Sequence, residues 1–71
     1  MNRQEAAKLY FVSFCIEQYK VYWGMKGGEV MRLFDKHHVT EYLYDHYDVL
    51  HTQGTAWLMA EIGDYIKEQT A

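Results

Sequence analysis

The chain has 71 residues, which limits it to one small domain. Its net charge of -3 argues against a nucleic-acid-binding protein, because such proteins need a basic surface. The sequence contains neither a signal segment nor an apolar run near the ~20 residues that span a membrane. Its lone cysteine, Cys15, fits a reducing compartment, so we expect a soluble cytoplasmic protein.

The charges are divided unevenly along the chain. Residues 1–38 carry six basic and four acidic side chains, whereas residues 39–71 carry one basic and six acidic ones. The simpler expectation is that the two halves complement each other, within one fold or across a dimer. The acidic half would also suit a basic protein partner.

Hydrophobic periodicity and the positions of the glycines predict four helices and no strands. The predicted helices cover residues 3–23, 28–38, 40–53 and 56–69. The sequence therefore predicts an all-α fold in one domain, a compact bundle of about four helices around a central first helix.

The first helix is predicted to begin after Asn2, a good N-cap residue that Glu5 follows three positions later, as in a capping box. Inside the helix only Ser13, Glu17 and Lys20 form a polar strip at ~100° per residue. A helix that is apolar around the rest of its circumference is covered on several sides. Three short helices would cover only part of it, and the remainder would be left for a second chain.

Turn and capping residues mark the ends of the later helices. Thr40 is the expected N-cap of the third helix, and Gly54 is its expected C′ residue. Thr55 is the expected N-cap of the fourth helix. Gly63 lies inside that helix, which indicates close backbone packing or simple tolerance.

Each predicted helix has one apolar line that is expected to face the core. In chain order these lines are Phe11, Cys15, Tyr19 and Tyr22; Val30, Leu33, Phe34 and His37; Leu43, Tyr47 and Leu50; and Leu58, Ile62, Tyr65 and Ile66.

The stretch YLYDHYDVLHTQG, residues 42–54, is the one segment that resembles a catalytic or metal-binding cluster. On a helix His46 and His51 point about 140° apart, so they cannot share one metal ion. His46 is therefore predicted to be a partly buried, hydrogen-bonded residue beside the core line. His51 is predicted to be a last-turn residue that the helix dipole favours. The sequence predicts no metal site, no cofactor and no catalytic residue.

A short pattern in the second predicted helix suggests an alternative. Arg32 and His37, with four residues between them, resemble the arginine–histidine pattern of small all-helical HEPN ribonucleases. On one helix the two side chains point about 140° apart, so such a site would need a dimer. Cys15 lies in the apolar stripe of the first helix and is expected to be an inert, buried thiol.

Two stretches, FVSFCIEQYK at 11–20 and LYDHYDVLHTQG at 43–54, resemble a family of short uncharacterised bacterial proteins known only as a domain of unknown function. The resemblance covers roughly residues 8–66, and its most specific part is the Y-D-V-L-H-T-x-G string from Tyr47 to Gly54. It implies a stand-alone cytoplasmic protein whose gene lies beside a gene resembling ADP-ribosyltransferases. That arrangement would suggest an antitoxin-like or accessory partner, and the resemblance carries over no catalytic residue.

We expect a non-enzymatic protein-interaction module that binds a protein partner or forms a homodimer, and that binds neither nucleic acid nor membrane. A small helical enzyme, such as a dimeric HEPN-like ribonuclease, and a structural homo-oligomer are the alternatives. Aromatic residues make up 17% of the chain, and a domain of this size cannot enclose every ring, so some rings must be partly exposed. Exposed tyrosines and tryptophans are typical interface anchors, and a small core padded with tyrosine is the alternative. The candidate partner-binding residues are Trp57, Tyr22, Trp23, Glu61 and Asp64. The alternative for Trp57 is that it folds back over the turn between the first two helices.

Overall fold

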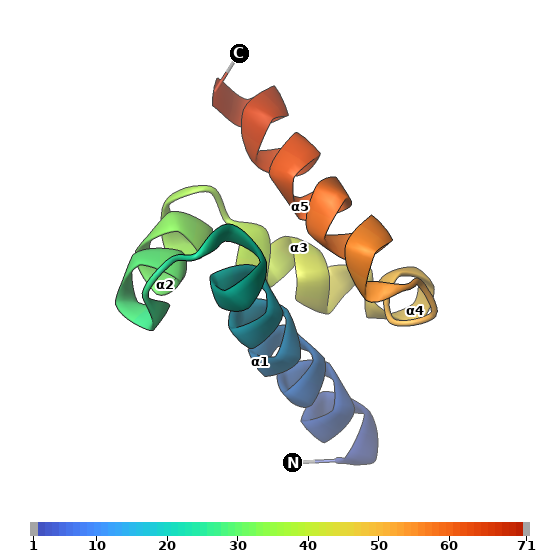
Figure 1. Cartoon of the computed structure of the whole chain (residues 1–71). Helices are drawn as coiled ribbons and strands as arrows, with labels where there is room; N and C mark the ends of the chain where they lie inside the picture. The colour runs from blue at the N-terminus through green and yellow to red at the C-terminus, as the bar shows by residue number, and fades with distance from the viewer. Residues whose placement is uncertain (1, 71) are drawn as a thin grey trace.

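Five helices make up the computed structural model, which describes the backbone of residues 2–70 and the side chains of residues 2–69 (Figure 1). In chain order they are α1 (Arg3–Trp23), α2 (Gly27–Lys36), α3 (Val39–Asp45), α4 (Tyr47–Leu50) and α5 (Thr55–Thr70). No strand occurs in the described part of the chain, so the predicted all-α fold is confirmed.

Helix α1 is the centre of the bundle and packs against α2, α3 and α5. In Figure 1 it rises from the N-terminus at the bottom of the molecule, while α5 passes its far end and reaches the C-terminus at the top. The radius of gyration of 11.6 Å is close to the value of about 11 Å expected for a compact chain of this length. None of the described helices is long and apolar enough to cross a membrane.

Both ends of α1 follow from the sequence. The Oδ1 atom of Asn2 accepts a hydrogen bond of 2.8 Å from the backbone N–H of Glu5, so the predicted N-cap is confirmed. At the other end Gly24 has a φ of 63°, a left-handed conformation that glycine adopts without steric cost. Its N–H bonds the carbonyl groups of Lys20 and Val21, which closes the helix.

The predicted apolar lines supply most of the core. Rings connect the elements: Tyr19 of α1 meets Phe34 of α2 edge-on at a centroid distance of 5.2 Å, and Phe11 meets Tyr47 of α4 in the same way at 5.5 Å. The buried apolar residues are Phe11, Val12, Cys15, Tyr19, Val30, Phe34, Val39, Leu43, Leu50, Leu58, Met59 and Ile62.

Helix α1 keeps several large apolar side chains exposed. Eight large apolar side chains of the described residues are strongly exposed, and five of them lie on this helix: Leu9, Tyr10, Val21, Tyr22 and Trp23. Tyr22, expected on the core line, is 54% exposed instead. The described helices therefore leave part of the apolar surface of α1 uncovered.

The predicted third helix is two short helices. The chain bends at His46, which ends α3 and precedes α4 with φ −108° and ψ 21°. Its N–H still bonds the carbonyl of Tyr42, so the bend disturbs little of the hydrogen bonding. Neither glycine nor proline marks the bend, and it lets Tyr47 pack on Phe11 while Leu50 stays in the core.

The predicted caps around these helices are wrong. Helix α3 begins at Val39, before Thr40, because His38 takes a left-handed conformation and turns the chain at once. Helix α4 ends at Leu50, four residues before Gly54. The carbonyl of Gly54 accepts a hydrogen bond from the N–H of Leu58. Thr55 is therefore the first residue of α5 and not its N-cap.

The conformation of His38 leads to a prediction for stability. A φ of 56° costs an L-residue about 1–2 kcal/mol, and glycine escapes that penalty. The contact of His38 with Glu41, at 4.0 Å and exposed, contributes little. His38→Gly should therefore raise the free energy of unfolding by ~0.5–1 kcal/mol in urea titrations. His38→Val, the control, should lower it, and equal losses in the two variants would contradict this account.

Candidate protein-binding groove

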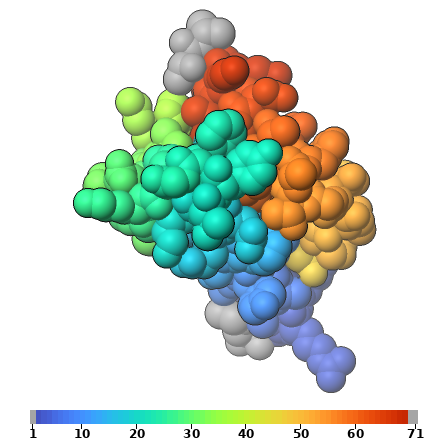
Figure 2. Space-filling model, in the orientation of Figure 1, coloured from blue at the N-terminus to red at the C-terminus, as the bar shows by residue number. Residues whose placement is uncertain are grey.

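A groove with a volume of about 400 Å³ lies between the last turns of α1 and the middle of α5. In Figure 2 the end of α1, in teal, lies directly beside the orange surface of α5. Its lining residues are Tyr19, Tyr22 and Trp23 from α1, and Ala60, Gly63, Asp64, Ile66 and Lys67 from α5. The groove is therefore mainly apolar and aromatic, with charged groups at two of its positions.

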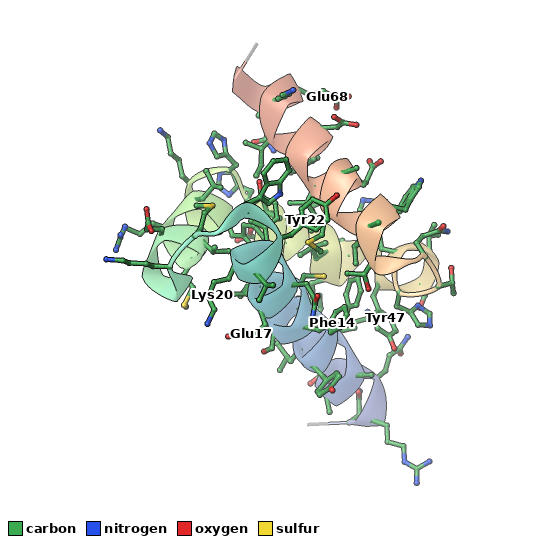
Figure 3. The ribbon with its side chains drawn as sticks, viewed as in Figure 1. Phe14, Glu17, Lys20, Tyr22, Tyr47 and Glu68 are labelled. Carbon is green, nitrogen blue, oxygen red and sulfur yellow. The ribbon has the colours of Figure 1, made fainter. Side chains whose placement is uncertain are left out.

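The α1 wall of the groove is a set of rings fixed to the core. Tyr19 is buried and packs on Phe34, and the ring of Trp23 lies 6.1 Å from it. Tyr22 meets Trp23 edge-on at 5.4 Å, on the side of α1 that faces α5 (Figure 3). These contacts restrict the exposed rings in advance, so an incoming group would bind them at a low cost in conformational entropy.

The α5 wall is low. Ala60 and Gly63 project no more than a methyl group, and a Cβ atom built on Gly63 would meet no other atom within 4 Å. Ile66 is partly buried, while Asp64 is exposed. An apolar side chain or a helix backbone could therefore lie between the two walls within reach of the Asp64 carboxylate.

The five candidate partner-binding residues divide into two groups. Tyr22, Trp23 and Asp64 come together in the groove. Glu61 turns toward α3, where its Oε1 accepts a hydrogen bond of 3.3 Å from the hydroxyl of Tyr42. Trp57 is 47% exposed but does not line the groove, and it stacks on no other ring of residues 2–69.

The Glu61 contact belongs to a small polar cluster that ties α5 to α3. Tyr42 stacks on Tyr65 with a centroid distance of 4.0 Å and an interplanar angle of 16°. Partial burial, and then the neighbouring Glu61 carboxylate, raise the pKa of the Tyr42 phenol above its ordinary value. The phenol therefore stays protonated and donates to Glu61, which is a structural role.

A second hollow, of about 390 Å³, lies between the first half of α1 and the segment around α4. Phe14 and Tyr47, labelled in Figure 3, line it together with His51. His51, predicted as a last-turn residue of a longer helix, is the C-cap of α4. Its Nδ1 lies 2.6 Å from the carbonyl oxygen of Tyr47, and its ring stacks on the Tyr47 ring at 4.2 Å. Because a carbonyl only accepts, Nδ1 carries the proton in this bond.

The prediction for His46 is wrong. The residue is exposed and its ring lies 4.9 Å from the ring of Tyr42, but its side chain makes no hydrogen bond among the described residues. The bend between α3 and α4 explains the difference, since a helical wheel for one continuous helix no longer applies beyond His46.

The structure does not favour a nucleophilic cysteine, a ribonuclease-like arginine–histidine pair or a metal site among the described residues. Cys15 is fully buried, and burial raises its pKa to about 12, so the thiol is neutral. His37 is only 8% exposed whereas Arg32 is exposed, so one chain does not present both side chains of the HEPN-like pattern to solvent. Within residues 2–69, no three His, Cys, Asp or Glu side chains gather where they could hold a metal ion.

Sequence reasoning missed the α5 wall. It noted Gly63 and offered close backbone packing or tolerance, but the structure shows open space beside this residue. In the sequence, only the spacing of Ala60 and Gly63 by three residues indicates a helix face with small side chains. That this face lies opposite the rings of α1 becomes visible only in the folded structure.

The fold and the groove together define the class of protein: it is an all-α domain with an aromatic groove between its first and last helices. A family model described as "Protein of unknown function (DUF3791)" matches residues 10–69, and the chain belongs to this family. Neither the comparison with curated proteins nor the comparison with solved structures gives a match.

The two histidines of the α3–α4 region should differ in their effect on stability. His51→Ala removes a hydrogen bond to a helix end and a ring stack, and should lower the free energy of unfolding by ~0.5–1 kcal/mol. His46→Ala, at an exposed position without a side-chain hydrogen bond, should change it by less than ~0.5 kcal/mol. Urea titrations at pH 7 measure both, and a larger loss for His46→Ala would contradict the placement of these rings.

The buried thiol predicts a loss of stability in alkali. Burial raises the pKa of Cys15 from 9.0 to about 12, so above pH 9 the unfolded chain releases a proton that the native state keeps. The protonated Cys15 thiol makes its full contribution to the free energy of unfolding below pH 9. That free energy should therefore fall by ~1 kcal/mol between pH 8 and pH 10. Cys15→Ala should remove this part of the pH dependence in urea titrations, whatever its effect at pH 7. Parallel curves for the two proteins would contradict the prediction.

Proposed function

We propose that this chain is a non-enzymatic, cytoplasmic protein-interaction module whose α1–α5 groove receives part of a partner protein. The observation that carries the proposal is the pair Tyr22 and Trp23, each more than half exposed. Trp23 packs beside the buried Tyr19, and Tyr22 packs on Trp23. Exposed, pre-ordered aromatic rings beside a groove are the usual anchors of protein interfaces.

The titratable groups support binding rather than catalysis. Among residues 2–69, the groups with shifted pKa values are Cys15, Tyr19 and Tyr42; in each case burial is the first cause, and the pKa is raised. Raised values keep all three groups neutral near pH 7, whereas an acid, base or nucleophile needs a pKa near its working pH.

The partner we propose is the product of a neighbouring gene, as the family resemblance implies. The chain would bind a larger enzyme resembling ADP-ribosyltransferases, either to neutralise it as an antitoxin does or to assist it. The acidic second half of the chain, with six acidic residues against one basic residue, supports a protein partner over nucleic acid or an anionic membrane surface.

The two tryptophans provide a matched test of the groove. Trp23 lines it and Trp57 does not, yet their exposed fractions are similar at 53% and 47%. With the purified product of the adjacent gene, Trp23→Ala should raise the dissociation constant at least ~10-fold by calorimetry, while Trp57→Ala should leave it within ~3-fold.

Circular dichroism is the control, and both variants should keep the helix content of the wild type. Equal weakening by the two variants would place the partner elsewhere on the surface. Failure of the wild-type chain to bind the adjacent gene product at all would end the proposal that this product is the partner.

A further inference from the structure

We infer that the occupant of the α1–α5 groove is a basic amphipathic helix of the partner protein. This inference rests on the proposed function and names the element that binds. Three observations carry it: the open position at Gly63, the helical walls of the groove, and the acidic charge that the fold leaves unbalanced.

Neither the backbone conformation nor close packing within the described residues requires a glycine at position 63. A glycine inside a helix costs about 1 kcal/mol relative to alanine, which other proteins offset with a positive φ or close packing. Gly63 has neither, because its φ is not positive and a Cβ there would meet nothing within 4 Å. With Ala60, it forms a low surface that another backbone can approach closely.

The groove has the shape that receives a third helix. Its walls are two helices, and the lining residues of α5 span positions 60–67, about 10 Å or two helical turns. A partner helix lying there would place apolar residues at i, i+4 and i+7 against Tyr22, Trp23 and Ile66. An extended segment would fit less well, because no strand edge of the described chain offers it backbone hydrogen bonds.

The charges predict a basic partner. Helix α5 carries Glu61, Asp64 and Glu68 against Lys67, so it has an excess of two acidic groups. Asp64 and Lys67 both line the groove, and Glu68 lies beyond it toward the C-terminal end of the helix (Figure 3). The ion pairs of Glu17 with Lys20 and of His38 with Glu41 are local. No lysine or arginine of residues 2–38 pairs with a described acidic side chain of the second half, so the expected balance between the halves does not come from ion pairs within the fold.

A second copy of this chain would fit the groove less well than a basic helix, because its charge has the wrong sign. It would bring another net charge of -3, and its own α5 has the same excess of acidic groups. A partner helix with lysine or arginine beside its apolar face would instead meet Asp64 at the groove and the acidic groups along α5.

The test uses the full chain and three synthetic, fluorescein-labelled 18-residue peptides. The first is an idealised helix with leucine and tryptophan at i, i+4, i+7 and i+11 and lysine and arginine elsewhere. The second keeps the apolar positions and replaces the basic residues with glutamate. The third has the composition of the first in a scrambled order. Fluorescence anisotropy should show binding of the first peptide at least ~10-fold tighter than of the other two.

Gly63→Leu separates binding from folding. It should fill the groove and weaken binding of the basic peptide at least ~10-fold, while raising the melting temperature because leucine favours the helix over glycine. Gly28→Leu is the matched control on α2, where an added Cβ has only an ordinary contact at 3.6 Å with Arg32. It should leave the binding constant unchanged.

Three results would overturn the inference: no binding of the basic peptide, equal binding of the acidic one, or equal effects of the two leucine variants. A dimer in light scattering that Gly63→Leu dissociates would assign the groove to a second copy and would also overturn it. Binding of the adjacent gene product is measured separately. Success there with failure of the peptides would reject the helix and leave the proposed function standing.

Discussion

The packing of the rings around Tyr19 is the interaction on which the rest of the structure depends. This buried ring joins α1 to α2 through Phe34, and the ring of Trp23 lies beside it at the surface. A helix with so much apolar circumference needs cover on all sides, but the chain offers only short helices and one longer one. The core therefore ends at Tyr19, and Tyr22 and Trp23 remain outside it.

That incomplete cover leaves the surface that we propose for partner binding. The contacts of Trp23 with Tyr19 and of Tyr22 with Trp23 restrict the two exposed rings, which would lower the entropic cost of binding there. The acidic helix α5 forms the facing wall, with Gly63 and Ala60 leaving room and Asp64 adding charge. Under this proposal the residues that stabilise the domain would also bind the partner.

The sequence predicted the parts of the fold that local chemistry determines. Asn2 and Gly24 end α1 through their own hydrogen bonding and conformation, and periodicity identified the core lines. It failed at His46 and His38, where tertiary packing bends the chain without glycine or proline. Three of the five candidate site residues meet in the groove, while Trp57 and Glu61 lie apart from them. A helical wheel gives the direction of a side chain on its own helix, but it does not show which element lies opposite.

One NMR measurement tests the central claim that the aromatic groove is the binding surface. The chain has two tryptophans, so a ¹⁵N spectrum contains two indole N–H signals, assigned with Trp23→Phe and Trp57→Phe. On addition of the adjacent gene product, the account predicts that the Trp23 signal shifts or broadens while the Trp57 signal changes little. A shift confined to Trp57, with Trp23 unchanged in a formed complex, would contradict it.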